Sequence, residues 1–203
     1  MARRNDHSRE QLRDLAIESV LNIVDQDANA PVTARAVTQG MGYTVGTLYL
    51  IFSNLDDLLM QVNTELLKRL HSDMQFSVKS EVDPQVTILI MAKCYFSLAE
   101  QYPGRWQLLS RHRDTVSDNE IDHVVEAIFM LVETALARLA PMRNSKEIAI
   151  AARALWSAIH GICVVNASGH LRRRAYYDAR SLVRTLIHTY LSGFTQESID
   201  CAT

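Results

Sequence analysis

The chain has 203 residues, 48% of them hydrophobic, with only 7 glycines and 4 prolines. This is enough apolar material for a buried core, and the scarcity of glycine and proline favours an all-α protein. The formal net charge of −2 excludes a protein that binds polyanions by its overall charge.

Cysteine usage and hydropathy bear on the compartment. Cys94, Cys163 and Cys201 are odd in number and widely spaced, which is typical of a reducing compartment and not of a disulfide framework. The polar stretch from Arg3 to Arg13 does not resemble a signal peptide, and no uninterrupted apolar run reaches the ~18 residues of a transmembrane helix. We expect a cytoplasmic protein that lies outside the membrane.

The first predicted helix follows a short basic arm. Arg3 and Arg4 lie in an arm that is either solvated or available to a polyanion, and Ser8 and Gln11 then have the spacing of a capping box. Apolar residues at helical spacing predict a helix with one buried face, and they are Leu12, Leu15, Ala16, Val20, Ile23 and Val24.

The segment from Thr33 to Phe52 has the pattern of two short helices joined by a tight turn. Thr33 and Thr44 are each placed to cap a helix, and the glycines Gly40 and Gly42 are expected to allow positive φ angles between them. Leu48 and Phe52, four residues apart, point to the core and leave the opposite face of the second helix for a partner. A helix, a tight turn and a second helix present one rod to the major groove of DNA.

This segment resembles the N-terminal domain of the TetR/AcrR family of transcriptional regulators, whose pattern is roughly T-x-x-x-I-A-x-x-x-G-v-s-x-g-t-l-Y-x-h-F-x-s-K-e-x-L. The matching residues are Thr33, Val37, Gly42, Tyr43, Thr44, Gly46, Thr47, Leu48, Tyr49, Phe52, Asp56 and Leu58. The chain departs from the pattern at Ile51 and Leu55. Leu55 stands where the family has a Lys that ordinarily meets a phosphate.

The resemblance implies an all-α protein with a helix-turn-helix head at residues 1–53, a connecting helix at 54–76 and a regulatory body at 77–203. Asn54 is expected to cap the connecting helix. Pro84 suits the first position of the next helix. Residues 86–102 of that helix are apolar on nearly all sides, so we expect it to be buried in a bundle. With these, about nine helices are predicted, the later ones at 105–113, 118–140, 144–163 and 176–194.

The second short helix has no Arg, Lys, Asn or Gln to pair with bases. Its readout is expected to rest on hydroxyls, on methyl groups against thymine and on close approach at Gly46. The alternatives are packing beneath the helix for Tyr49 and a solvated side chain for Arg35. The predicted DNA-binding residues are Thr33, Arg35, Tyr43, Thr44, Val45, Gly46, Thr47 and Tyr49.

The resemblance further implies a cavity for a small-molecule effector in the body. Residues that are able to line it are Met91, Tyr95, Trp106, Phe129, Met130, Trp156 and His160, which suits an apolar or amphipathic ligand. Ordinary core packing is the alternative for each of them, and a buried hydrogen-bonded imidazole is the alternative for His160. The run Trp156-x-x-x-His160-Gly161 is similar to a signature of one TetR branch.

The last helix has an apolar face too broad to be left bare. The resemblance implies that the last two helices of two subunits form a four-helix bundle, with an interface of Leu182, Val183, Leu186, Ile187, Tyr190, Leu191 and Phe194. The expected function is a homodimeric repressor that binds a palindromic operator in double-stranded DNA and is released by its effector. The alternative is a helical protein that binds a lipid or an acyl carrier, with the head as a protein-docking module.

Motifs of enzymes and metal sites do not fit the sequence. The spacing of Gly40, Gly42 and Gly46 is one residue too long for a dinucleotide fingerprint, and no strand precedes it. No P-loop, H-E-x-x-H motif or paired cysteines occur, and the single Glu120-x-x-His123 cannot build a two-metal site alone. We expect no catalytic residues, no metal and no cofactor.

Overall fold

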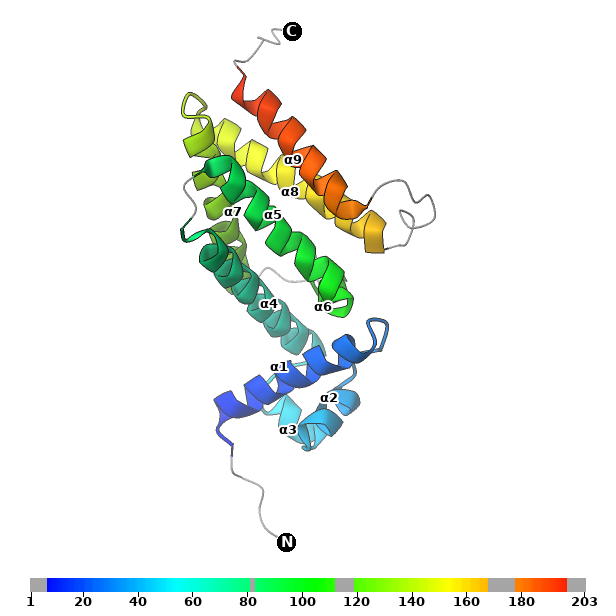
Figure 1. Ribbon diagram of the computed structural model, residues 1–203. Helices are drawn as coiled ribbons and strands as arrows, with labels where there is room; N and C mark the ends of the chain where they lie inside the picture. Colours follow the sequence, from blue (N-terminus) through cyan, green and yellow to red (C-terminus); the bar gives the residue numbers. More distant parts are fainter. Residues whose placement is uncertain (1–6, 81–82, 112–118, 168–177, 197–203) are drawn as a thin grey trace, which may run out of the picture. The chain divides into compact units, whose positions relative to one another are not determined.

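The computed structural model describes residues 7–80, 83–111, 119–167 and 178–196 (Figure 1). The described residues form helices and connecting loops, which confirms the predicted all-α class. The basic arm at Arg3 and Arg4, and Cys201, lie outside them. Nine helices are described, α1 (Arg9–Gln26), α2 (Ala34–Met41), α3 (Val45–Tyr49), α4 (Leu55–Val78), α5 (Pro84–Gln101), α6 (Pro103–Arg111), α7 (Asn119–Leu139), α8 (Ser145–Ala167) and α9 (Ala179–Thr195).

The chain divides into two compact units. The first unit comprises residues 1–67 and 102–121, and the second comprises residues 68–101 and 122–203. The helix α6 therefore belongs with α1, α2 and α3, although it follows α5 in the chain. Its position in the first unit was not expected from the sequence.

The core of the first unit explains why its short helices fold. The predicted capping box starts α1, since the Ser8 hydroxyl accepts the Gln11 N–H and the Gln11 side chain accepts the Ser8 N–H. The apolar face of α1 then packs on the inner faces of α2, α3 and α4. The fully or almost fully buried residues include Ala16, Val20, Leu21, Val37, Leu48, Phe52, Leu58 and Val62.

The helix α6 is held on the end of α1 by close backbone packing and an ion pair. The guanidinium of Arg105 donates two hydrogen bonds to the Asp25 carboxylate, at 2.9 and 2.6 Å. A Cβ atom on Gly104 would overlap the carbonyl oxygen of Val24, so only glycine fits there. Pro103 opens α6, because proline suits the first helical position.

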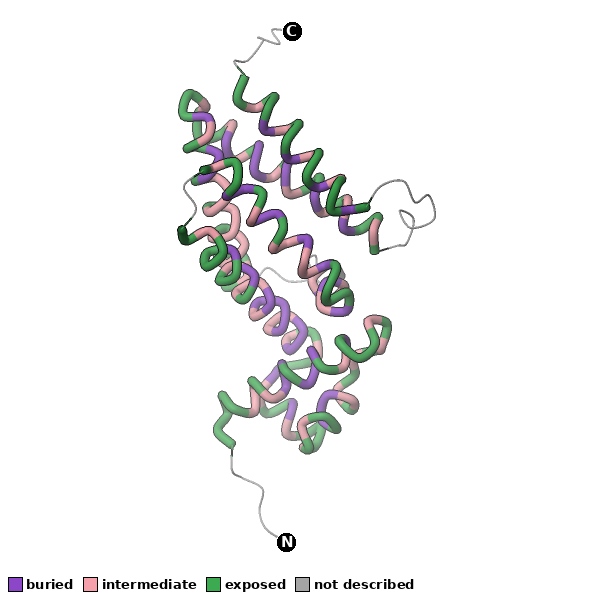
Figure 2. The backbone as a smooth tube through the Cα atoms, in the orientation of Figure 1, coloured by how far each residue is buried: buried purple, intermediate pink, exposed green. Residues whose placement is uncertain are grey.

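The second unit is built on α5, α8 and α9, which run side by side (Figure 1). The helix α8 buries Ile148, Ala151, Leu155, Ile159 and Cys163 at helical spacing and leaves its opposite face exposed (Figure 2). Burial raises the pKa of the Cys163 thiol to about 12, so this thiol is not a nucleophile at neutral pH.

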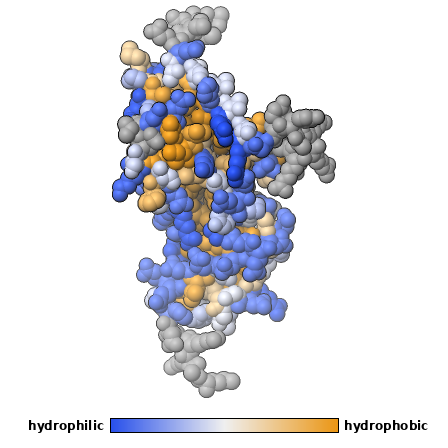
Figure 3. All heavy atoms as spheres, viewed as in Figure 1, coloured by the Kyte–Doolittle hydropathy of each residue, from blue (hydrophilic) through white to orange (hydrophobic). Residues whose placement is uncertain are grey.

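The prediction that α5 is buried on all sides was wrong. One face of α5 is buried, with Ile88, Met91 and Phe96, whereas Val86 and Leu89 are exposed. Figure 3 shows apolar side chains gathered on the face of the second unit that carries α5 and α8. The second unit thus leaves apolar surface uncovered in a single chain.

One described helix, α8, is long and apolar enough to cross a membrane by length and composition. Its 18-residue window is one-third buried within the chain, and the first half of α8 carries Glu147 and Arg153 in ion pairs with other residues of the second unit. A core helix of a helical bundle meets the same criterion, so this feature alone gives no membrane assignment.

Candidate DNA interface and effector site

Hydroxyl caps position the two short helices of the first unit. The Thr33 hydroxyl accepts the Ala36 N–H at 3.2 Å and starts α2, and the Thr44 hydroxyl accepts the Thr47 N–H at 3.3 Å and starts α3. Both caps were predicted. They matter because helices of eight and five residues are too short to be stable without caps and tertiary packing.

The turn between α2 and α3 depends on Gly42. This residue has φ of 75°, in the left-handed region, and the next N–H, of Tyr43, donates to the Thr38 carbonyl. The prediction of a positive φ at Gly40 was wrong, because Gly40 is the penultimate residue of α2. A side chain at Gly40 would instead collide with the Ser19 hydroxyl, which donates to the Val37 carbonyl. Gly40 therefore permits α1 and α2 to approach closely.

The helix α3 presents one face to the core and the opposite face to solvent. Leu48 is fully buried, while Val45, Tyr49 and Leu50 are 37%, 48% and 78% exposed. Leu50 follows α3 with helical φ and ψ of −75° and −19°. At 3.6 residues per turn, Gly46 and Leu50 lie roughly 160° around the axis from Leu48. Gly46 and Leu50 are therefore the residues that a partner of this face meets first.

The hydroxyls of α3 are engaged with each other. The oxygens of Thr44 and Thr47 are 3.1 Å apart and share a hydrogen bond, in addition to the cap that Thr44 makes. One of the two hydroxyl protons is used in that bond. At most one of the two protons is therefore available to an external acceptor.

Two side chains from the start of α1 reach the helix-turn-helix, and sequence analysis did not identify either. Nδ1 of His7 and the Tyr43 hydroxyl are 2.6 Å apart and share a hydrogen bond. The guanidinium of Arg9 donates to the Ile51 carbonyl at 3.4 Å. No local motif marks these residues, because the contacts join positions 36 and 42 residues apart in the chain. Of the predicted DNA-binding residues, Thr33, Arg35 and Thr44 are exposed and Tyr43 and Thr47 are half-buried.

The first turn of α4 contains the carboxylate of Asp57, two residues after Leu55, which stands at the position of the lysine in the TetR/AcrR pattern. Asn54 caps α4 through the Asp57 N–H, as predicted, and Asp57 accepts hydrogen bonds from the Ser53 N–H and hydroxyl and from Gln61. Burial raises the pKa of Asp57, but these hydrogen bonds outweigh it and lower the pKa below the ordinary value. Leu55 is half-buried and supplies no charge.

Four of the seven predicted effector-site residues come together in the second unit, and we call them the aromatic cluster: Tyr95, Phe129, Trp156 and His160. The Tyr95 hydroxyl and Nδ1 of His160 are 2.8 Å apart and share a hydrogen bond. The ring of Trp156 lies 5.2 Å from that of His160 and 6.0 Å from that of Phe129. All four side chains are partly exposed, so the cluster combines apolar rings with one polar pair.

Arg153 borders the aromatic cluster. Its guanidinium lies 4.6 Å from the centre of the Phe129 ring and donates to Glu133 at 2.7 Å and to Glu126 at 3.2 Å. These contacts join α8 to α7 beside Trp156. One guanidinium thus pairs with two carboxylates beside the cluster.

The other three predicted effector-site residues differ from the aromatic cluster in their unit or in their exposure. Trp106 is buried in the first unit, on α6, where it contributes to the core. Met130 on α7 is 64% exposed, and Met91 on α5 is fully buried. The sequence marks Trp106 and Met130 only as large apolar residues, and it does not show that α6 packs with α1 or that Met130 is exposed to solvent.

The predicted dimer face of α9 was too broad. Val183, Ile187 and Leu191 are buried within the chain itself, because they form the side of α9 that packs on α8 and α5. They are core residues and have no surface left for a second copy. The partly exposed members are Leu182, Leu186, Tyr190 and Phe194, which recur every four residues along α9.

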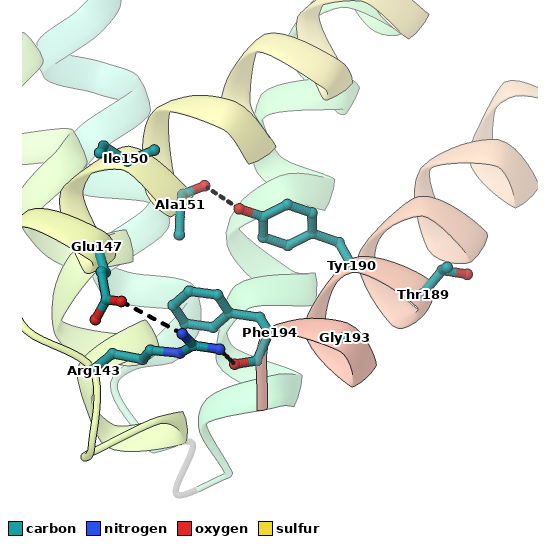
Figure 4. Close-up of a pocket in the computed structure, with 8 residues that line it drawn as sticks. All are labelled: Arg143, Glu147, Ile150, Ala151, Thr189, Tyr190, Gly193 and Phe194. Atoms are coloured by element: carbon teal, nitrogen blue, oxygen red, sulfur yellow. Dashed lines mark hydrogen bonds and ion pairs between the residues drawn. The ribbon is translucent and has the colours of Figure 1, made fainter. Parts of the chain in front are cut away.

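The exposed face of α8 continues this surface. Its residues share helical spacing and are apolar or small, and they are Ile150, Ala154, Ser157, Ala158, Gly161, Val164 and Val165. Between α8 and α9 lies a groove of about 530 Å³ (Figure 4). At one end of the groove, the guanidinium of Arg143 lies over the Phe194 ring and donates to the Phe194 carbonyl. The Tyr190 hydroxyl donates to the Ala151 carbonyl. None of the predicted effector-site residues lines this groove.

Comparison with solved structures identifies the fold. The chain is similar to a protein of unknown function from Rhodococcus sp. RHA1, with 15% identity and a TM-score of 0.79 over 96% of this chain and 100% of that one. It is also similar to the transcriptional regulator FadR from Bacillus subtilis in complex with stearoyl-CoA, with 13% identity and a TM-score of 0.70 over 89% and 98% of the two chains. A TetR transcriptional regulator from Rhodococcus sp. RHA1 has 18% identity and a TM-score of 0.67 over 91% and 98%.

No curated protein matches the chain in sequence. A family model does match, and it describes the C-terminal domain of tetracyclin repressor-like proteins over residues 88–190. That range runs from α5 into α9 and is independent of the helix-turn-helix, which lies before it. The helix-turn-helix and the model agree, and the chain belongs to the TetR family of transcriptional regulators.

Proposed function

We propose that this regulator is a repressor that binds an inverted-repeat operator as a homodimer. The observation that carries the proposal is the arrangement of α3, which is capped by Thr44, anchored in the core by Leu48 and exposed on the opposite face. An exposed short helix held rigidly by a second helix is the geometry that enters the major groove.

The exposed groups around α3 support phosphate contacts on both sides of the groove. Arg35 on α2 and Arg9 at the start of α1 supply positive charge, and the paired His7 and Tyr43 supply polar groups. We propose that Arg9 takes over the phosphate contact that the family's lysine makes, since Leu55 is uncharged. Thr33, Thr44, Val45, Gly46, Thr47 and Tyr49 complete the proposed interface.

The bare face of the second unit supports a dimer built from α8 and α9. The small residues in the middle of α8 allow two helices to approach closely, and Ile150, Val164 and Val165 supply apolar area at its ends. Tyr190 and Phe194 of α9 flank this surface. A two-fold axis through it would give an isologous four-helix bundle and so a pair of recognition helices.

We propose that the aromatic cluster binds the effector. Aromatic rings beside the hydrogen-bonded pair of Tyr95 and His160 suit an amphipathic molecule with a polar head. The FadR protein from Bacillus subtilis binds stearoyl-CoA in a structure of the same fold. A long-chain acyl-CoA is therefore the first effector to test, and release of DNA requires that it bind one state of the dimer more tightly than the other. The proposed location is the cytoplasm.

The test is selection of bound sequences from a random DNA pool by the purified full-length protein, followed by salt titration on the winner. We expect an inverted repeat, with affinity that falls as salt rises because phosphate contacts release counterions. Stearoyl-CoA is then added to the complex, with the Trp156→Ala variant as control. A protein that enriches no sequence would instead fit the alternative of a helical lipid-binding protein.

A further inference from the structure

We infer that the protein reads its operator chiefly through the methyl groups of thymine, with Leu50 as a specificity-determining residue. The inference rests on the proposed DNA-binding function and adds to it the chemistry of the readout and a residue outside the family pattern's fixed positions. It follows from which groups α3 exposes and which it does not.

Exposed apolar side chains of the first unit are concentrated at α3. Among its described residues, the large hydrophobic side chains that are exposed are Val45, Tyr49, Leu50 and Tyr102. The ring of Tyr102 lies under the guanidinium of Arg105, which is 4.5 Å from the ring centre, so this exposed ring has a partner within the first unit. The other three fall within six consecutive residues, so the apolar surface of this unit and the recognition element coincide.

Leu50 stands where a base edge would be met. It lies on the side of the axis opposite Leu48 and one helical turn after Gly46, which has no side chain to hold the helix away from DNA. No structural need for Gly46 is evident, because an added Cβ would have the Thr44 hydroxyl at 3.7 Å as its nearest neighbour. On the exposed face of α3, a position without a side chain, Gly46, is therefore followed one turn later by the aliphatic side chain of Leu50.

Hydrogen-bonding readout on this face is scarce. The side chains of residues 44–50 contain no amide, guanidinium or ammonium group, and Thr44 and Thr47 use one hydroxyl proton in the bond between them. The Tyr49 hydroxyl remains as a further polar group. In the major groove the only apolar group on a base pair is the C5-methyl of thymine, so an aliphatic side chain discriminates A·T from G·C pairs there by contact with that methyl.

The experiment compares thymine with uracil, which has the same hydrogen-bonding edges and lacks the methyl group. Full-length protein selects sequences from a random pool, and the winning site is remade with deoxyuridine at each thymine in turn. We expect thymine at fixed positions in both half-sites, and a roughly fourfold rise in Kd for each contacted methyl that is removed.

Variants of Leu50 test whether this side chain makes the methyl contact. Leu50→Gln replaces the aliphatic end of the side chain with an amide, and the Kd of this variant should be the same for thymine and uracil at the positions that Leu50 contacts. Leu50→Met stays apolar and should keep the preference, and Met130→Gln, an exposed residue of the second unit, should not alter it.

Three outcomes would overturn the inference, and they are distinguishable. An inverted repeat bound equally well with thymine and uracil would contradict methyl readout and leave the operator proposal intact. A uracil effect that persists unchanged in Leu50→Gln would show that Leu50 does not read the methyl group. Failure to enrich any sequence would overturn the proposed function, and the inference with it.

Discussion

The two units of this regulator differ in how completely they bury their apolar side chains. The first unit, with its short helices, closes a core around Leu48 and Phe52 and exposes apolar groups mainly at α3. The second unit has longer and more apolar helices, yet it leaves Val86, Met130 and Ile150 in contact with solvent. We propose that the exposed apolar surface of the first unit contacts DNA and that the exposed apolar surface of the second unit is covered by a second copy of the chain.

The strongest test of the closed core is truncation of Leu48. Leu48→Ala should lower the free energy of unfolding by about 2–5 kcal/mol, because the side chain is fully buried and its removal leaves a cavity. Denaturant titration of the full-length protein measures the loss. Leu50→Ala, two residues further on, serves as control and should change stability little. Equal effects of the two substitutions would contradict the assigned faces of α3.

A charge on the bare face of α8 should break the dimer. Ile150→Arg would bury an unpaired guanidinium in the proposed interface, so sedimentation should show a monomer, and affinity for the inverted repeat should fall about 100-fold because the two half-sites are no longer bound together. Met130→Arg is the control, since Met130 is equally exposed but lies on α7. A dimer that survives Ile150→Arg would place the interface elsewhere.

Two glycines of the first unit should respond differently to the same substitution. Gly104→Ala should cost about 1–3 kcal/mol of stability, because the new methyl group meets the Val24 carbonyl. Gly46→Ala has room within the protein and should keep or slightly raise stability while it weakens DNA binding. Thermal unfolding and DNA titration separate the two. Loss of stability in Gly46→Ala would show that this glycine serves the fold.

The smallest expected effect concerns the start of α4. Asp57→Asn should cost about 0.5–2 kcal/mol at neutral pH, because the carboxylate anchors Ser53. The pKa of Asp57 is lowered in the folded protein, so its stabilisation is present above the ordinary value of 3.8 and is lost as the pH falls through the folded-state pKa. Stability of the variant and of the parent protein should converge in acid. A difference that stays constant between pH 7 and pH 3 would contradict this role.

Local signals predicted most of the helices. Capping residues such as Ser8, Thr33 and Thr44 fix helix starts through bonds to backbone two or three residues away, so they are visible in sequence. The predicted ranges 54–76 and 144–163 also agree with α4 and α8 to within a few residues. What local signals did not show is which helices pack together, and this is why α6 was assigned to the body and Trp106 to the effector site.

Candidate site residues divide in the same way. Thr44, Gly46 and Tyr49 were identified because a contiguous motif contains them. The contacts of His7 with Tyr43 and of Arg9 with Ile51 depend on how α1 crosses the helix-turn-helix, and no pattern in either segment encodes that. Leu50 had a usable signal, since it lies four residues after Gly46 and two after the buried Leu48. On α9, the sequence showed a wide apolar face but not which part of it the chain itself covers.

The most direct test of the central claim is the symmetry of the DNA that the full-length protein selects from a random pool. The account predicts an inverted repeat whose half-site centres are about 10–10.5 base pairs apart, or a multiple of that, bound by two subunits. An asymmetric site occupied by one subunit, or no enriched sequence at all, would contradict it.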